Sequence, residues 1–496
     1  MSIIARFDSE MPDYMNDIPE ILRAYDPHII IDQTSSNFIS VLAYEHENSI
    51  TLEINSNLTD TMSQSLALKS TNTLIRKREA KRFVQNILYE YCLALTNVHL
   101  PYGSLTGVHP AKLANEAIEM QVPDVARYLC QSFHVMQNQA NLIYNVAKNA
   151  RRELLIPKKG EVDIYVNIPF CTSRCKYCSF ISVEIWRVKK QINEYIKILN
   201  DEIEAILKYI DSKNYSIRAI YVGGGTPTAL TSQELWEALH QLQGKASEFT
   251  VEAGRPDGFT IDKMQVIEKL LATRISLNPQ TLSDDTLKII GRNHTFQDFE
   301  MKFEEVRKNF GFDINVDFIA GLPGEMPSQY YSNVLRVAEQ FGPENITLHS
   351  FSLKRGSEFR EKVKEVSSED ILTGMSQLRE YSELTRSTLQ EFGYIPYYMY
   401  RQKNTVGNLE NVGFSRQGSE CKYNMDSTNE NVSILAAGAG AMTKWVHAEE
   451  NRIERYHNPK GFREYIERMP KRVQEILRVA EDSGDLFALL PTRSFN

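Results

Sequence analysis

The chain has 496 residues, of which 42% are hydrophobic and 24% are charged, as is typical of an ordinary soluble globular protein. The formal net charge of −8 argues against a nucleic-acid-binding protein, since such proteins are usually basic. We expect a cytoplasmic protein, because residues 1–8 lack the apolar core of a signal peptide and no apolar run approaches the ~18–20 residues of a membrane span.

Residues 1–155 are predicted to form an accessory α+β region, in which a small sheet is followed by helices. Strands are predicted at residues 41–44 and 49–54, and the second strand has apolar residues at alternate positions, as a half-buried strand does. From about residue 69 to residue 154 the apolar residues follow a helical period. The basic run at residues 76–82 is interpreted as a solvated helix face, with RNA binding as the weaker alternative in an acidic chain.

From residue 161 onward, short apolar runs alternate with amphipathic stretches. Strands are predicted at residues 163–168, 217–222, 249–253, 274–277, 314–319 and 345–351. Helices are predicted between them, at residues 188–212, 232–243, 261–271, 296–310 and 329–341. Repeated strand–helix units indicate a parallel sheet, and six units are too few for a closed eight-stranded barrel. We therefore predict an α/β fold, a six-unit (β/α)6 partial TIM barrel over residues 156–365.

Residues 366–496 are predicted to form a mostly helical region that covers the substrate. One helix is expected at residues 371–392, and further helix is expected around residues 462–481. The part between these helices is rich in tyrosine and glycine and is predicted to be irregular.

A cysteine motif with C-x3-C-x2-C spacing follows the first predicted barrel strand and consists of Cys171, Cys175 and Cys178. Three thiolates this close in sequence can hold one metal centre and leave a coordination position open. Structural zinc sites usually have four protein ligands, whereas three cysteines suit a [4Fe–4S] cluster with one iron free for another ligand. The spacing therefore favours an iron–sulfur centre, with zinc and an incidental grouping as the alternatives. The remaining cysteines are interpreted as small apolar side chains, and they are Cys92, Cys130 and Cys421.

Further polar residues and glycines lie where the other predicted strands end, which is where parallel α/β folds place their functional residues. The glycines at 223–225 would let backbone N–H groups approach a ligand closely, although a plain tight turn is an equal alternative. Glu252 and Asp317 could accept hydrogen bonds from ribose hydroxyls or an amine; a helix N-cap or a solvated strand end is the alternative. His349 lies on the sixth strand. We expect these residues to share one rim with Cys171.

Taken together, these motifs resemble a known family. The cysteine spacing, the aromatic Tyr177 before the last cysteine and the Gly-Gly-Gly-Thr-Pro-Thr run at residues 223–228 resemble the radical S-adenosylmethionine (SAM) enzymes. Residues 165–171, 274–280 and 317–324 resemble the oxygen-independent coproporphyrinogen III dehydrogenases. Three further stretches resemble the HemZ-type branch of these enzymes, at residues 106–113, 396–404 and 407–413. Residues 252–256 read Glu-Ala-Gly-Arg-Pro where the better-known branch has Glu-x-Asp-Pro, and this difference recurs in the HemZ-type branch.

The resemblance implies a [4Fe–4S] cluster held by the three cysteines, with SAM bound to the open iron. It also implies the SAM contacts, which are Tyr165, Tyr177, Gly225, Thr226, Glu252, Gln280, Arg292 and Asp317. In such enzymes SAM is split to give a 5′-deoxyadenosyl radical, which takes hydrogen from the β-carbon of a propionate; loss of CO2 and one electron then leaves a vinyl group. The implied activity converts coproporphyrinogen III to protoporphyrinogen IX, with electrons from a donor protein such as flavodoxin or ferredoxin.

A tetrapyrrole with four carboxylates would need aromatic walls and cationic donors, and arginine suits carboxylates well. One short stretch offers both, with Tyr394, Tyr397, Tyr398, Tyr400, Arg401 and Lys403. The predicted substrate contacts are Tyr397, Tyr398, Tyr400 and Arg401, and the alternative is a tyrosine-rich strand that only packs on the barrel. Two other functions stay open for the whole chain: a haem-binding or haem-delivering chaperone, and a radical SAM enzyme that acts on another tetrapyrrole.

Overall fold

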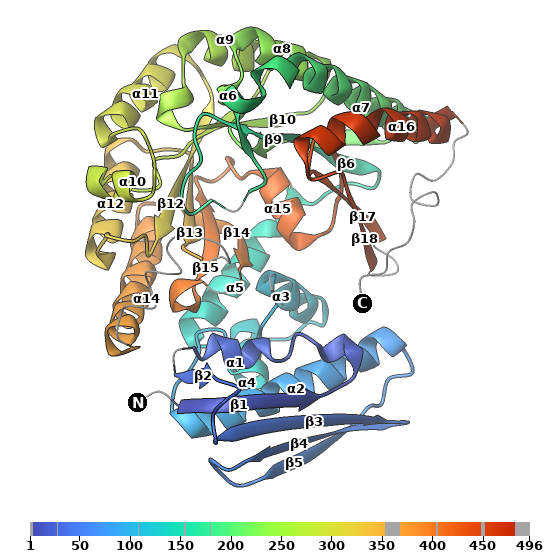
Figure 1. Ribbon diagram of the computed structural model, residues 1–496, viewed down its shortest axis with the longest axis vertical. Helices are drawn as coiled ribbons and strands as arrows, with labels where there is room; N and C mark the ends of the chain where they lie inside the picture. The colour runs from blue at the N-terminus through green and yellow to red at the C-terminus, as the bar shows by residue number, and fades with distance from the viewer. Residues whose placement is uncertain are drawn as a thin grey trace.

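The computed structural model describes residues 3–26, 28–107, 109–152, 155–178, 180–352, 368–402, 405–447 and 452–481. Within these residues the strands form a five-stranded sheet, an eleven-stranded main sheet and a small two-stranded sheet. Figure 1 shows the five-stranded sheet at one end of the molecule and an arc of helices around the main sheet at the other. No helix in the described part of the chain has the length and apolar character needed to cross a membrane.

The N-terminal sheet has the order β2-β1-β3-β4-β5. Its strands are β1 (Ile3–Glu10), β2 (Ile29–Ile31), β3 (Phe38–His46), β4 (Ser49–Ser56) and β5 (Met62–Ala67). The helices α1 (Glu20–Ala24) and α2 (Thr73–Thr96) share a hydrophobic core with this sheet. The two predicted strands are confirmed within β3 and β4, and the alternating side chains Ile50, Leu52 and Ile54 are fully buried. The predicted solvated basic face is the start of α2, where Lys81 pairs with Asp17.

The next three helices belong to the main body of the molecule. They are α3 (Pro110–Glu119), α4 (Val125–Phe133) and α5 (Gln137–Ala150). Their buried side chains join the hydrophobic core of the main sheet, whereas residues 5–100 have a core of their own. The predicted domain boundaries after residues 155 and 365 stay predictions, and the second lies outside the described residues.

The six predicted parallel strands are confirmed as neighbours in the main sheet. They are β6 (Glu161–Ile168), β9 (Ser216–Gly224), β10 (Glu248–Gly254), β11 (Arg274–Leu277), β12 (Asp313–Ala320) and β13 (Asn345–Ser350). The predicted helices between them are also confirmed, as α7 (Ile192–Ser212), α8 (Ser232–Leu239), α9 (Ile261–Lys269), α11 (Phe296–Asn309) and α12 (Pro327–Gln340). These helices lie along the outer side of the sheet (Figure 1). Because the six strands are parallel, their C-terminal ends, which carry the glycines and polar residues, meet at one edge of the sheet.

In the C-terminal region the two predicted helices are confirmed, but the prediction of an irregular middle is wrong, because that part forms strands and one further helix. At one edge of the main sheet, β14 (Ile395–Arg401) and β15 (Glu410–Ser415) continue from β13 in antiparallel order. At the other edge, β16 (Ser433–Ala437) pairs in parallel with β6 and leads into β17 (Met442–His447) and β18 (Arg452–His457). An open six-stranded sheet leaves unpaired N–H and C=O groups at both edges, and these strands satisfy them. The helices of the region are α14 (Ser368–Glu391), α15 (Lys422–Asn429) and α16 (Phe462–Glu481).

A buried carboxylate joins α7 to this C-terminal region. Glu202 is 1% exposed and accepts hydrogen bonds from Tyr465 Oη at 2.6 Å, Asn458 Nδ2 at 2.7 Å and the Gly438 backbone N at 2.8 Å. Burial raises the pKa of Glu202 to about 7, against the opposing effect of these three donors. The three partners come from α16 and from the segments that flank β17 and β18, so one side chain fixes the edge of the main sheet.

Replacing Glu202 with leucine is expected to lower the free energy of unfolding by about 3 kcal/mol or more, because three buried donors lose their acceptor. Thermal or urea denaturation would measure this as a lower unfolding midpoint. The control is Glu204→Leu on the same helix, where the exposed Glu204 forms a surface ion pair with Lys208; a surface change of this kind should stay within about 0.5 kcal/mol. Equal midpoints for the two variants would contradict the role given to Glu202.

Candidate functional site

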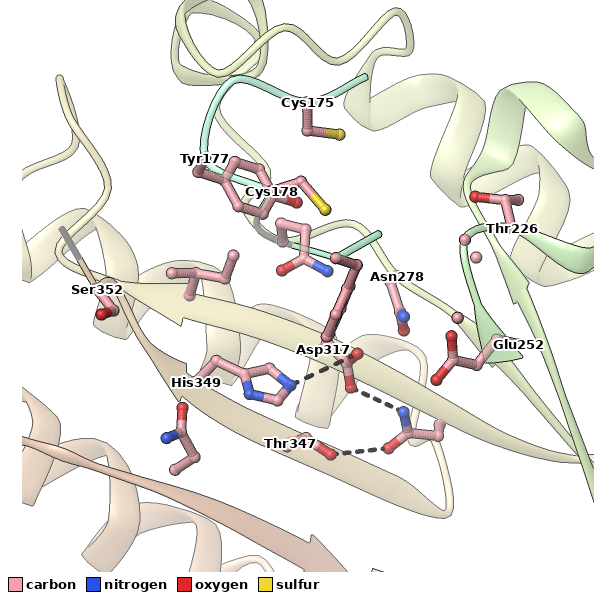
Figure 2. A pocket seen from close by; sticks show the side chains of 18 of the residues that line it. Cys175, Tyr177, Cys178, Thr226, Glu252, Asn278, Asp317, Thr347, His349 and Ser352 are labelled. Atoms are coloured by element: carbon pink, nitrogen blue, oxygen red, sulfur yellow. Dashed lines mark hydrogen bonds and ion pairs between the residues drawn. The ribbon is translucent and has the colours of Figure 1, made fainter. Parts of the chain in front are cut away.

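A cavity of about 450 Å³ opens where the six parallel strands of the main sheet end (Figure 2). Residues at or just after the ends of β9, β10, β11, β12 and β13 line it, together with the loop after β6 that carries the cysteines. The sequence-predicted residues that line it are Cys171, Cys175, Tyr177, Cys178, Gly225, Thr226, Glu252, Gln280, Arg292, Asp317, Tyr398 and Tyr400. The structure thus brings most of the predicted site together.

The three cysteines lie on one loop, closed at its base by the short strands β7 (Phe170–Cys171) and β8 (Val183–Glu184). Burial raises the pKa of the thiols of Cys171 and Cys178. Two donors approach the sulfur atoms: Arg255 Nη1 lies 3.8 Å from Cys175 Sγ, and Thr226 Oγ1 lies 3.9 Å from Cys171 Sγ, where its hydrogen bond opposes the rise in the pKa of Cys171. No three His, Cys, Asp or Glu side chains among the described residues converge on a single metal ion. A [4Fe–4S] cluster does not need such convergence, since each cysteine binds a different iron.

The glycine run packs the cysteine loop against the end of β9. The backbone N–H of Gly225 donates to Ile168 O at 2.8 Å, and that of Thr226 donates to Phe170 O at 2.6 Å. A Cβ at Gly225 would collide with the Phe170 carbonyl, and one at Gly223 would lie 2.8 Å from Cδ of Glu252. The run is therefore more than a plain tight turn. Its N–H groups at 225 and 226 serve the protein itself, while Gly225 and Thr226 still line the cavity.

Two carboxylates face the cavity from β10 and β12, which β11 separates in the sheet (Figure 2). Glu252 accepts a hydrogen bond from Tyr221 Oη at 2.7 Å, and Asp317 lies 3.6 Å from His349 Nε2. Burial raises the pKa of Glu252 to about 7, and the charge of Asp317 acts in the same direction. Burial lowers the pKa of His349, but the hydrogen bond and charge of Asp317 outweigh it, so this pKa is raised overall. Neither carboxylate caps a helix, and both can accept hydrogen bonds from a ligand.

Several buried polar atoms of the lining have no hydrogen-bond partner in the described structure. They are Asn278 Oδ1, Gln280 Oε1, Arg292 Nε and His109 Nδ1. Gln280 also has a φ of 67°, a left-handed conformation that is rare for a residue other than glycine. Buried polar atoms without partners cost free energy, and strained backbone is concentrated at ligand sites. These atoms therefore fit a polar ligand that supplies both donors and acceptors, beside three cysteines.

The predicted residues on β14 are divided between two faces of the strand, because side chains alternate along a strand. Tyr398 and Tyr400 line the cavity. Tyr397 is 1% exposed and does not line the cavity; a register shift between Pro396 and Tyr398 breaks the alternation there, so the Tyr397 ring lies 4.8 Å from that of Tyr398, in one cluster with Cys421. Arg401 lies 4.1 Å from the centre of the Tyr102 ring, away from the cavity. Lys403 lies outside the described residues.

Tyr165 lies outside the main cavity, in an adjoining one of about 320 Å³. The two cavities share Phe180, Gly224 and Ser427 in their linings. Sequence reasoning gave no role to several further lining residues, namely His109, Arg255, Asn424, Ser427 and Thr428. The signals for His109 and Arg255 were the motifs that contain them, whereas α15, which carries the other three, lay in the part predicted to be irregular.

Comparison with known proteins agrees with this arrangement. The model of the Radical SAM superfamily matches residues 165–332. The oxygen-independent coproporphyrinogen-III oxidase-like protein HemZ of Bacillus subtilis is 32% identical over 422 residues, which cover 82% of this chain and 83% of that protein. The heme chaperone HemW of the same organism is 28% identical over 285 residues, covering 56% and 69%. A solved structure of coproporphyrinogen III oxidase (HemN) from Escherichia coli, described as a radical SAM enzyme, matches 68% of this chain and 73% of the HemN chain. The sequence identity is 18% and the TM-score is 0.49.

Proposed function

We propose that this chain, which belongs to the radical SAM superfamily and there to the HemZ-like proteins, is an oxygen-independent coproporphyrinogen III dehydrogenase. It would convert two propionates of coproporphyrinogen III to vinyl groups and so give protoporphyrinogen IX. The observation that carries the proposal is the cavity in which the cysteine loop, the unpartnered polar atoms and the tyrosines of β14 meet.

The residues present fit the cofactors of the superfamily. Cys171, Cys175 and Cys178 would hold a [4Fe–4S] cluster, and the unpartnered Gln280 Oε1 and Arg292 Nε would bind polar groups of SAM. When bound, the reduced cluster and SAM supply a 5′-deoxyadenosyl radical, the species that removes a hydrogen atom from the substrate. Tyr177 accepts a hydrogen bond from Arg292 Nη2 at 3.2 Å, which fixes the guanidinium beside the cysteine loop.

The chain itself would position and enclose the ligands. Glu252 and Asp317 would accept hydrogen bonds from the amine and ribose hydroxyls of SAM. Tyr398 and Tyr400 give the cavity an aromatic wall, held by the hydrogen bond between Tyr398 Oη and Thr347 Oγ1 at 3.3 Å. Such walls would exclude water from a reactive intermediate.

The electron donor in this proposal is a protein such as flavodoxin or ferredoxin. Near the cysteine loop, Phe180 is 65% exposed and Trp186 is 64% exposed, and Arg174 is also exposed. An apolar surface beside a cation suits an acidic partner that must approach the cluster closely.

The affinity for SAM is expected to rise about tenfold between pH 6 and pH 8, because the pKa of Glu252 is raised to about 7 and its carboxylate binds donors better than its neutral acid. Equilibrium binding of SAM to the reconstituted protein measures this. Glu252→Gln should lose this tenfold contribution and keep only the rise that comes from the amino group of SAM, whose pKa is about 8. An unchanged pH dependence in Glu252→Gln would contradict the role of Glu252.

Anaerobic incubation of the reconstituted protein with SAM, a reductant and coproporphyrinogen III tests the proposed function. Formation of a vinyl product is expected. SAM cleavage without a vinyl product would overturn the substrate assignment in favour of another tetrapyrrole.

The second candidate function, a haem chaperone, is supported by the similarity to HemW. Tight stoichiometric haem binding without turnover of coproporphyrinogen III would favour it. The same preparation can be titrated with haem, so both candidates are tested side by side.

A further inference from the structure

Four basic side chains surround the carboxylate of Glu430 beside both cavities, and the proposed function gives them no role. We call this group the Glu430 cluster; it consists of Glu430, His109, Lys112, Lys444 and Arg455. Glu430 Oε2 accepts a hydrogen bond from Lys112 Nζ at 2.7 Å, and Oε1 accepts one from Arg455 Nη2 at 2.7 Å. Oε1 also lies 3.6 Å from Lys444 Nζ and 3.9 Å from His109 Nε2. The residues come from α3, β17, β18 and the positions that flank α3 and α15.

The charges of the Glu430 cluster do not balance. One carboxylate faces the three cations Lys112, Lys444 and Arg455, so two positive charges are in excess. The largest electrostatic effects on Lys444 and His109 come from other members of the cluster. Burial lowers the pKa of Lys444, and the charges of Arg455 and Lys112 act in the same direction. In a chain with a net charge of −8, this local surplus of positive charge suits an anion bound beside it.

A ligand in the cavities can reach this cluster. His109 lines the main cavity and Lys444 lines the adjoining one. Lys444 Nζ also donates a hydrogen bond at 2.9 Å to the carbonyl of Ser427, a residue that both cavities share. The side chains of Lys112 and Arg455 are 35% and 44% exposed, so they are open to an incoming carboxylate. In Figure 1, α15 lies above α3, with β17 and β18 beside it.

The buried arginines of the main cavity donate hydrogen bonds to neighbouring protein groups, and the free Nε of Arg292 is assigned to SAM. Arg292 Nη1 donates to Asn278 O at 2.6 Å. Arg255 Nη2 donates to Asp257 Oδ2 at 2.7 Å, and its Nη1 donates to Ser173 Oγ at 2.8 Å. Arg401, the cation that the sequence suggested for the substrate, points away from the cavity. Among the described residues, the Glu430 cluster offers cations to a carboxylate that extends past Ser427.

We propose that the Glu430 cluster is a binding site for the carboxylates of a polycarboxylate tetrapyrrole, which anchors the propionates that do not react. The site rests on the proposed function for its ligand, and it deepens that function by naming residues that select a polyanionic ring. Lysine and arginine donate charge-assisted hydrogen bonds to carboxylates, and the two excess cations match a pair of propionates. The competing role is a purely structural clasp between α3 and the β17–β18 hairpin.

The test uses the double variant Lys112→Gln/Arg455→Gln, which removes two cations and keeps similar side-chain lengths. The control is Lys208→Gln/Arg468→Gln, which removes two cations from exposed ion pairs on α7 and α16. The probes are coproporphyrin III and its uncharged tetramethyl ester, titrated by absorbance in the same mild detergent. Melting midpoints are measured for all proteins.

The double variant should bind coproporphyrin III at least about tenfold more weakly than the wild type and the control, with unchanged affinity for the ester. In turnover, it should show a raised KM with kcat nearly unchanged. Unchanged affinity for coproporphyrin III would overturn the inference. Equal losses for acid and ester, together with a lowered melting midpoint, would also overturn it and leave the structural clasp.

Failure of the proposed function gives a different pattern. If the wild type binds coproporphyrin III through the Glu430 cluster but forms no vinyl product, the carboxylate site stands and the dehydrogenase activity falls. If the wild type forms the vinyl product while the double variant keeps full affinity and KM, the activity stands and the inference falls. Absence of binding by the wild type would overturn the inference.

Discussion

Cys175→Ala is expected to reduce reductive cleavage of SAM by at least about a thousandfold, equivalent to about 4 kcal/mol of lost transition-state stabilisation. Cys175 lies on the loop between β7 and β8 and lines the cavity with the other two cysteines of the motif. With two thiolates left, the cluster loses a protein ligand, and the remaining donors are too few to hold it in place. Iron content, absorbance of the reconstituted protein and formation of 5′-deoxyadenosine measure the effect.

Cys130→Ala is the matched control for this variant. Cys130 lies on α4, far along the chain from the cysteine loop, and its Sγ lies 3.6 Å from Gln137 Oε1. Iron content and SAM cleavage should both stay at wild-type levels in this control. Full iron content in Cys175→Ala would show that the cluster, or the metal centre in its place, has other ligands.

Gly225→Ala is also expected to have a large effect, because it should lower both the content of the iron–sulfur cluster and the affinity for SAM. The added Cβ would meet the backbone carbonyl of Phe170 and would lie 2.9 Å from the carbonyl oxygen of Ile168. Neither backbone atom can turn aside as a flexible side chain would, so the cysteine loop must move away from β9. Overpacking of this kind costs about 1–3 kcal/mol, and the displacement falls on the residues next to Cys171. Iron content and SAM affinity should fall together.

Gly311→Ala controls for the change of glycine to alanine as such. A Cβ at Gly311 meets nothing within 4 Å, and neither Gly225 nor Gly311 has a positive φ. Gly311→Ala should therefore keep wild-type iron content and SAM affinity. A Gly225→Ala protein that behaved like this control would return the glycine run to the interpretation as a plain turn.

The parallel strands of the main sheet could be predicted from the sequence because each is a short apolar run followed by an amphipathic helix. The strands β14 to β18 could not, since Pro396 lies inside β14, Gly413 lies inside β15, and β16 is a five-residue run followed by the glycines at 438 and 440. Tyrosine is a favourable strand residue, and the run of tyrosines before Arg401 was the signal that was available. The need for partners at β6 and β13 is a property of the assembled sheet, and no local pattern carries it.

The candidate site could be predicted at the strand ends, because parallel strands bring their C-terminal ends to one edge. The assignment of the substrate contacts was less complete, since it treated the tyrosine-rich stretch as one surface. Strand alternation sends Tyr398 and Tyr400 to the cavity and Arg401 away from it, whereas the register shift between Pro396 and Tyr398 leaves Tyr397 packed against Tyr398 and outside the cavity lining. The motif at residues 106–113 contains His109, but its place in the cavity lining could not be predicted, because it depends on how α3 packs against the main sheet.

The most direct test of the proposed function uses coproporphyrinogen III deuterated at the propionate β-carbons, in anaerobic turnover with SAM and a reductant. Mass spectrometry would follow both products. The account predicts a tetrapyrrole with two vinyl groups in place of two propionates, together with deuterium in the 5′-deoxyadenosine. An intact tetracarboxylate ring, or 5′-deoxyadenosine without deuterium, would contradict it.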